Sequence, residues 1–268
     1  MRMRLAQALA TCAAFCIVAT GPAVAQQTAS APQCDAAAFR VIVDVGHTPE
    51  EPGAISARGA TEYDFNLRLA KVIEARLNET GFGRTSLLMA KGDAIPSLVR
   101  RIAQANAAGA DLLISVHHDS VPEAFKSFWQ FNGQQMQYSD RFRGHSIFVS
   151  RDNPHYRNSV AFGALLGARL KARGLVYTPH YREAFMGARR RTLVNADAGV
   201  YRYDQLLILR TTRMPAILLE AGSIVHRDEE LLMGDADHQR QIAGAVAEAV
   251  ERYCAMRGTN VRSAGAKR

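Results

Sequence analysis

The sequence predicts an α/β fold, a mostly parallel, twisted sheet with helices on both faces in a single domain. Short apolar runs rich in β-branched residues alternate along the chain with longer segments of helical periodicity. Strands that alternate with helices in this way favour a parallel sheet covered on both faces. His47, His117 and Glu220 each come just after one of the apolar runs. Because the sites of such sheets lie at the carboxyl ends of their strands, we expect these side chains to share one site.

Residues 1–25 are expected to form a secretory signal peptide. They combine basic residues at positions 2 and 4, a mostly apolar run from Leu5 to Val18, and a small-x-small cleavage site, Ala23-Val24-Ala25. A membrane anchor is the alternative, but the apolar run is shorter than the roughly 20 residues that span a bilayer. We therefore expect a periplasmic or secreted protein that has no stable membrane span after processing.

The mature chain is expected to hold one domain, residues 39–257, between a loose segment at 26–38 and a disordered basic tail at 258–268. This length suits one hydrophobic core and is short for two. The formal net charge of +8 favours an anionic partner, such as a cell-wall polymer, after export. No nucleic-acid-binding motif is recognisable, so nucleic acid is not an expected partner. We expect a monomer.

Two cysteines remain once the signal peptide is removed. Cys34 precedes the first expected strand, and Cys254 lies at the end of the last expected helix. In an oxidising compartment such a pair favours a disulfide that ties the two ends of the domain together. Their spacing is unlike that of a zinc-binding cysteine motif.

The first half of the domain is expected to supply strands and helices in strict alternation. The β-branched run before Gly46 and His47 predicts a strand, and apolar residues such as Phe65, Leu69 and Ile73 recur at helical spacing. The apolar run before His117 predicts a buried strand. In chain order, we expect a strand at 41–45, a helix at 63–79, a strand at 85–89, a helix at 95–108 and a strand at 112–116.

The second half alternates similar elements with two irregular segments. Residues 121–143 have no strong period and are interpreted as an excursion near the mouth of the site. Its aromatic side chains are expected to pack, and a platform for sugar rings is the alternative. Residues 175–202 are also irregular. The expected elements are a strand at 146–149, a helix at 159–173, strands at 206–209 and 216–219, and helices at 228–233 and 236–256.

The polar residues near the strand ends suit one zinc ion. His47, Glu62 and His117 would supply two imidazoles and a carboxylate, which is a ligand set of hydrolytic zinc sites that leaves one position open for water. A further carboxylate must then take a proton and return it to a leaving amine, and Glu220 is the candidate. The alternative interpretation is that these are rim residues making local hydrogen bonds.

Metal-bound imidazoles usually place their second nitrogen against a carboxylate or carbonyl group. Asp44 and Asp119 are close enough in sequence to the histidines to be candidates for this supporting role.

Three blocks of the sequence resemble, in family order, the zinc-dependent N-acetylmuramoyl-L-alanine amidases of bacterial cell walls. The first reads VIVDVGHTPEEPGA and continues, after a short gap, as TEYDFNLRLAKVIEARL; the others read SLVRRIAQANAAGADLLISVHHDS and LLILRTTRMPAILLEAGSIVHRDEELL. The resemblance implies zinc bound by His47, Glu62 and His117, with Glu220 as the catalytic carboxylate. It also implies cleavage of peptidoglycan at the amide between N-acetylmuramic acid and L-alanine, and it places Arg210 near the substrate.

The chain departs from the family pattern in places. His118 stands where the family often has a small residue, and alternation along a strand sends neighbouring side chains to opposite faces, so His117 is the expected ligand. Residues 175–202 could occupy the entrance that a long helix blocks in some division-associated amidases, which leaves a protein activator open. The alternatives to the amidase are a zinc peptidase acting within the stem peptide and a catalytically silent wall-binding module.

Overall fold

The computed structural model describes residues 34–265. The expected signal peptide, residues 1–25, lies outside the described residues, as do positions 26–33 of the expected loose segment and positions 266–268. Residues that follow Cys34 form a turn, in which the carboxylate of Asp35 accepts a hydrogen bond from the backbone nitrogen of Ala38 at 3.1 Å. Within the described range, no helix is both long and apolar enough to cross a membrane.

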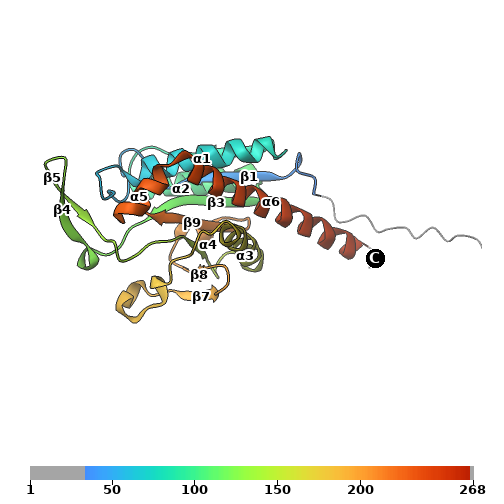
Figure 1. Cartoon of the computed structure of the whole chain (residues 1–268). Coiled ribbons are helices and arrows are strands. Elements are labelled where there is room, and N and C mark those ends of the chain that lie inside the picture. The colour runs from blue at the N-terminus through green and yellow to red at the C-terminus, as the bar shows by residue number, and fades with distance from the viewer. Residues whose placement is uncertain (1–33, 266–268) are drawn as a thin grey trace, which may run out of the picture. The chain divides into compact units, whose positions relative to one another are not determined.

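A sheet of seven strands forms the centre of the fold, in the order β2-β1-β3-β9-β6-β8-β7 (Figure 1). The strands are β1 (Arg40–Val45), β2 (Arg84–Leu88), β3 (Leu112–Asp119), β6 (Ser146–Val149), β7 (Thr192–Asn195), β8 (Val200–Arg202) and β9 (Ala216–Ser223). β1 is parallel to both β2 and β3, and β3 is parallel to β9. β6 runs antiparallel to β9, and β7 runs antiparallel to β8. The predicted mostly parallel sheet is confirmed.

Helices cover both faces of this sheet. One face carries α1 (Glu62–Glu79), α3 (Tyr156–Ala172) and α6 (Ala236–Gly265), and the other carries α2 (Ala94–Ala108) and α4 (Leu207–Thr211). Val41 and Val43 of β1 belong to the core under the first set, and Ile42 between them belongs to the core under the second. Burial on both faces explains why the central strands β1, β3 and β9 are mostly apolar.

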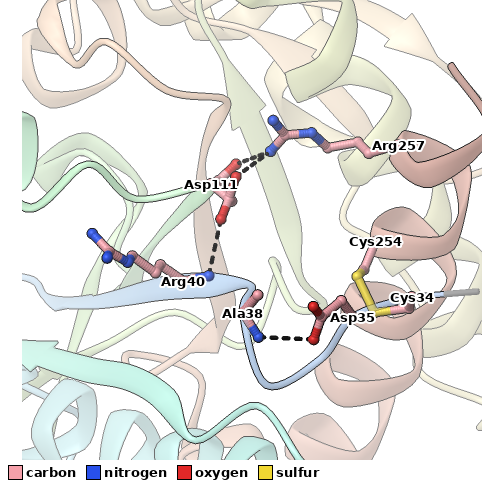
Figure 2. The surroundings of a disulfide bond; sticks show 7 residues. All are labelled: Cys34, Asp35, Ala38, Arg40, Asp111, Cys254 and Arg257. Carbon is pink, nitrogen blue, oxygen red and sulfur yellow. Dashed lines mark hydrogen bonds and ion pairs between the residues drawn. A yellow bond between two sulfur atoms is a disulfide. The ribbon is translucent and has the colours of Figure 1, made fainter. Parts of the chain in front are cut away.

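The amino-terminal end of the sheet is held by covalent and ionic contacts (Figure 2). Cys34 is joined by a disulfide to Cys254 of α6, with the two Cα atoms 5.1 Å apart. The Asp111 carboxylate, just before β3, accepts hydrogen bonds from the backbone nitrogen of Arg40 at 3.0 Å and from the Arg257 guanidinium at 2.9 Å. These contacts fasten the start of β1 and the last helix to one edge of the core.

One predicted strand is wrong. Residues 206–209 were expected to be extended, but Leu207–Thr211 form the short helix α4. The side-chain amide of Asn153, far away in the sequence, donates to the carbonyl of Leu209 in α4 and to the carbonyls of Thr212 and Met214 just after it. A short apolar run fits a helix or a strand equally well, and this long-range contact decides between them.

Two strands and one helix extend further than the sequence indicates. β3 continues to Asp119 and β9 to Ser223, so His117 and Glu220 lie inside strands rather than just beyond their ends. Backbone pairing continues where the apolar run stops, because His117 and Glu220 face each other in register. α6 continues to Gly265, whereas disorder was expected after Gly258.

The two irregular segments contain elements that the sequence did not reveal. Residues 121–143 include a hairpin of β4 (Ser127–Phe131) and β5 (Gln134–Tyr138), joined by Asn132 and Gly133. Both turn residues have positive φ, of 49° and 75°, which is the conformation that an Asn-Gly pair favours in a tight hairpin turn. Residues 175–202 include the 3-10 turns η2 (His180–Arg182) and η3 (Ala184–Arg189), followed by β7 and β8.

Candidate metal centre

His47 is presented by a strained backbone immediately after β1. Its φ is 68°, which is uncommon for a residue with a side chain. The preceding Gly46 donates its backbone N–H to the carbonyl of Val116 in β3 at 3.0 Å. A Cβ at Gly46 would lie 2.4 Å from the His117 ring, so only glycine fits there. The Gly-His pair therefore lets one histidine approach the other.

Glu62 is the first residue of α1, and the helix start fixes its position. Thr61 caps the helix, accepting a hydrogen bond from the backbone nitrogen of Asp64 at 3.2 Å. The Oε2 atom of Glu62 accepts from the backbone nitrogen of Ala54 at 3.1 Å, and its Oε1 atom accepts from the Asn66 amide at 3.3 Å. Both carboxylate oxygens are thus oriented by contacts from different segments.

The three expected ligands converge. Nε2 of His47 lies 3.1 Å from Oε1 of Glu62, and Nδ1 of His117 lies 3.0 Å from the same oxygen. One ligand atom from each residue lies within 4.8 Å of the others. The side chains of His47 and His117 are 31% and 15% exposed, so the group opens to solvent on one side. Two imidazoles and a carboxylate, arranged in this way, fit the donor set of an open zinc site.

The charge state of Glu62 also suits a metal ligand. Burial alone would raise its pKa, but hydrogen bonds to His117 and His47 and their charges outweigh burial and hold the pKa of the Glu62 carboxyl well below its usual range. Glu62 is therefore ionised near neutral pH, which is the form that binds a metal.

Glu220 lies on the neighbouring strand, next to the expected ligands. It is the register partner of His117, so the two side chains lie on the same face of the sheet. Its Oε2 atom is buried and has no hydrogen-bond partner among the described residues. Burial and the carboxyls of Asp119 and Glu62 raise the pKa of Glu220 well above its ordinary value. A bound dication would act in the opposite direction through its own charge.

The structure gives Asp44 partners other than the histidine rings. Its carboxylate is fully buried, and it accepts hydrogen bonds from Arg101 at 2.9 Å and 3.0 Å and from the Ser115 hydroxyl at 2.6 Å. Arg101 also donates to the carbonyl of Val45 at 3.0 Å. Asp44 therefore fixes the end of β1, two residues before His47, rather than an imidazole.

Asp119 also contacts groups outside the expected ligand set. The hydroxyl of Tyr181 in η2 donates to its Oδ1 atom at 2.7 Å, and Nε2 of His180 lies 3.8 Å from its Oδ2 atom. Burial raises the pKa of Asp119 to about 7, and the hydrogen bond from Tyr181 opposes the rise. Sequence reasoning missed Tyr181, and nothing in the irregular segment 175–202 distinguishes it.

His118 points to the opposite face from His117. Its Nδ1 atom lies 2.8 Å from Oδ1 of Asn66, and its ring packs against Phe65 with centroids 5.5 Å apart. Burial lowers the pKa of His118 to about 3. The second histidine of the pair is thus a neutral residue of the core under α1.

A cavity of about 170 Å³ adjoins the partly buried imidazoles of His47 and His117. Apolar side chains of α2 and α4, including Leu98, Leu207 and Ile208, form much of its wall, with His47 and His117 at one side. Arg210 is exposed on α4, the helix that contributes to this wall. The cavity gives the group of ligands an apolar neighbourhood large enough for a small side chain.

Comparison with known proteins identifies relatives across most of the chain. The sequence model of one family, described as N-acetylmuramoyl-L-alanine amidase, matches residues 41–252. The N-acetylmuramoyl-L-alanine amidase AmiA of Escherichia coli is 24% identical over 228 residues, covering 80% of this chain and 75% of AmiA. Two further amidase relatives are longer proteins, of which the chain spans about half.

Solved structures show the same fold. The amidase Ami1 from Mycobacterium smegmatis superposes with a TM-score of 0.62 at 18% identity, covering 81% of this chain and 97% of Ami1. The CwlD amidase from Clostridioides difficile, solved in complex with the GerS lipoprotein, superposes with a TM-score of 0.57 at 16% identity, covering 80% of this chain and 98% of CwlD. Together with the family match over residues 41–252, these likenesses establish that the chain belongs to the N-acetylmuramoyl-L-alanine amidase family.

Proposed function

We propose that this protein hydrolyses the amide bond between the lactyl group of N-acetylmuramic acid and L-alanine in peptidoglycan, with one zinc ion. The observation that carries the proposal is the shared carboxylate oxygen of Glu62, which lies 3.1 Å and 3.0 Å from the nitrogens of His47 and His117. Glu220 stands one strand away on the same face. Family membership supports the reaction, and this geometry supports the residues.

His47, Glu62 and His117 would hold the ion, and Glu220 would move the proton. When bound, zinc would supply Lewis acidity to the attacking water and to the scissile carbonyl. The Glu220 carboxylate would accept a proton from that water and, as the carboxylic acid, pass it to the leaving nitrogen of L-alanine. Without the ion, the raised pKa of Glu220 favours its protonated form, so its role as proton acceptor requires the positive charge of the bound ion, which lowers that pKa.

The substitution Glu220→Gln tests this division of roles. It removes the proton acceptor and keeps the size of the side chain, so the variant should retain about one zinc ion per chain. Hydrolysis of purified cell walls should fall by about a hundredfold to ten-thousandfold, the range that general acid–base groups supply. Metal analysis and a wall-lysis assay on the same preparation measure both effects. Normal lysis by the variant would rule out the role of Glu220.

Product analysis separates the amidase from the two alternatives. An amidase releases intact stem peptides that begin with L-alanine, whereas a peptidase acting within the stem releases shorter fragments. Mass spectrometry of a wall digest distinguishes the two sets of products. A zinc-loaded protein that binds walls and releases neither set would support the silent wall-binding module instead.

The site residues carried by resemblance remain part of the proposal. Arg210 is proposed to contact the substrate, because it lies on the helix that forms part of the wall of the cavity beside His47.

A periplasmic or extracellular location is proposed from the expected signal peptide and agrees with the disulfide between Cys34 and Cys254. A protein activator is proposed because CwlD, a structural neighbour, was solved in complex with a lipoprotein.

A further inference from the structure

The hairpin formed by β4 and β5 is a separate two-stranded sheet beside the proposed site. It follows the end of β3, the strand that carries His117, and extends away from the main sheet (Figure 1). An isolated hairpin is marginally stable in water, so one of its faces must be packed. The two faces of the hairpin differ in what they contact.

The inner face of the hairpin is fully used by packing. The indole nitrogen of Trp129 donates to the carbonyl of Ala57 at 2.9 Å, and Phe131 stacks on Trp129 with ring centroids 5.4 Å apart. The guanidinium groups of Arg58 and Arg227 lie 5.3 Å and 5.2 Å from the centre of the Trp129 ring. These contacts fasten the hairpin to the loop that also supplies a backbone donor to Glu62. The inner aromatics are therefore structural, as the sequence predicts.

The outer face has a different composition. Phe128 lies directly opposite Gln137, and Gln130 lies directly opposite Gln135. Phe128 is 61% exposed, and Gln130 and Gln135 are exposed as well. None of these four side chains is ionisable, in a chain of which 22% is charged. At the border of this face, Gln137 donates a hydrogen bond to the Glu123 carboxylate at 2.5 Å. Glu123 also forms an ion pair with Lys126, and this pair lies beside the face rather than within it.

A face made of three amides and one aromatic ring suits a neutral, hydroxyl-rich ligand. Each glutamine offers donors and an acceptor, which match sugar hydroxyls and N-acetyl groups. An exposed aromatic ring offers a flat apolar surface against which a sugar ring can lie. We propose that the outer face, comprising Phe128, Gln130, Gln135 and Gln137, binds the neutral N-acetylated glycan strand of the wall substrate. This inference rests on the proposed function, which supplies the substrate.

Two features of the structure favour a glycan over other occupants. The face lacks cations, so an anionic polymer or lipid would find no ion pair on it. The hairpin that carries this face is also joined to the proposed site along the chain, because it follows β3, the strand of His117, and its Trp129 bonds the loop that leads to Glu62. A glycan chain bound there could extend on either side of the sugar whose lactyl amide reaches Glu220. A second copy of this chain, pairing through the open edges of the hairpin, is the competing occupant.

Binding to glycan strands stripped of stem peptides tests the proposal directly. The full chain carrying Glu220→Gln is used, so that the ligand is not altered by hydrolysis. Adding Phe128→Ala, or Gln130→Ala together with Gln135→Ala, should each raise the dissociation constant for these strands about tenfold in cosedimentation, as expected for central contacts of a binding face. Val99→Ala, at a 54% exposed position on α2, is the matched control and should bind normally.

A kinetic comparison keeps this inference separate from the proposed function. Phe128→Ala, in the otherwise wild-type chain, should slow hydrolysis of intact walls about tenfold and leave hydrolysis of a single-sugar muramyl peptide unchanged, because that substrate does not reach the hairpin. Equal binding of stripped glycan by the wild-type and altered hairpins would overturn the inference. So would a dimer in sedimentation analysis that Phe128→Ala dissociates. Glycan binding without hydrolysis of either substrate would instead remove the proposed function alone.

Discussion

The two ends of the central sheet are held in different ways. At the amino-terminal end, the disulfide of Cys34 with Cys254 and the hydrogen bonds of Asp111 join the start of the domain to its last helix. At the carboxyl end, His47 has a left-handed backbone and the Oε2 atom of Glu220 is buried without a partner. One end combines contacts that stabilise the fold, and the other combines features that cost stability.

This difference separates stability from chemistry. A strained residue costs about 1–3 kcal/mol, and a buried polar atom without a partner costs about as much, so both persist only where the rest of the structure compensates. A covalent link far from the site can provide that compensation without touching the reacting groups. Substitutions at the amino-terminal end should therefore alter unfolding, and those at the carboxyl end should alter metal binding and turnover.

The largest expected effect is the loss of metal on substitution of His47. In His47→Ala the ligand set drops to two residues, so the bound zinc should fall from about one per chain towards none, and turnover should fall about a thousandfold or more. Metal analysis after dialysis and a wall-hydrolysis assay measure these losses. Full zinc occupancy in this variant would contradict the ligand set.

His47→Gly is the matched variant for the backbone. It also lacks the ligand, but glycine adopts a φ of 68° without strain. In metal-free protein, the free energy of unfolding of His47→Gly should therefore be about 1 kcal/mol larger than that of His47→Ala, so the glycine variant is the more stable one. Urea titration of the two variants makes the comparison, and equal stabilities would show that the left-handed conformation carries no strain.

The next effect concerns the opposite end. Replacing Cys34 and Cys254 together with serine opens a link across 220 positions of the sequence. The free energy of unfolding should fall by about 4 kcal/mol, because the unfolded chain regains conformational freedom. Zinc content and turnover at 25 °C should stay close to those of the wild type. A parallel loss of zinc would show that the two ends are not independent.

An effect smaller than that of the disulfide is a dependence of stability on pH at the carboxyl end. Burial lowers the pKa of His145 to about 4, and the carbonyl of Val176 opposes this shift. The unfolded state takes up a proton as pH falls through about 6.5, whereas the folded state does so only near 4. The contribution of His145 to the free energy of unfolding is thus fully present above about pH 6.5 and is lost as the pH falls towards 4.

Unfolding of metal-free protein at pH 7 and pH 5 tests this expectation. Between pH 7 and pH 5, the free energy of unfolding of the wild type should fall by about 2 kcal/mol more than that of His145→Gln, because glutamine does not titrate. Urea titrations of both proteins at each pH give the difference. Identical losses would show that His145 does not contribute to the pH dependence.

The predictions from sequence succeeded where a local pattern determines the structure. Helical spacing of apolar residues such as Phe65, Leu69 and Ile73 placed α1, whose observed start at Glu62 differs by one position. β-branched runs placed the central strands. The predictions failed where distant contacts decide, as at α4, where the Asn153 amide donates to carbonyls in and just after the helix. The hairpin was missed even though Asn132-Gly133 is a recognised turn signal, because the surrounding segment has little alternation.

By itself the sequence determined the α/β class, the apolar strands, and the residue types that could hold a metal. It did so because periodicity and strand-end position are properties of short segments. Only the tertiary structure decided that Glu62 reaches both His47 and His117 through one oxygen, and that Asp119 bonds Tyr181 rather than either of those histidines. Such contacts join residues that are far apart in the chain, and they depend on register and packing, which no local pattern encodes.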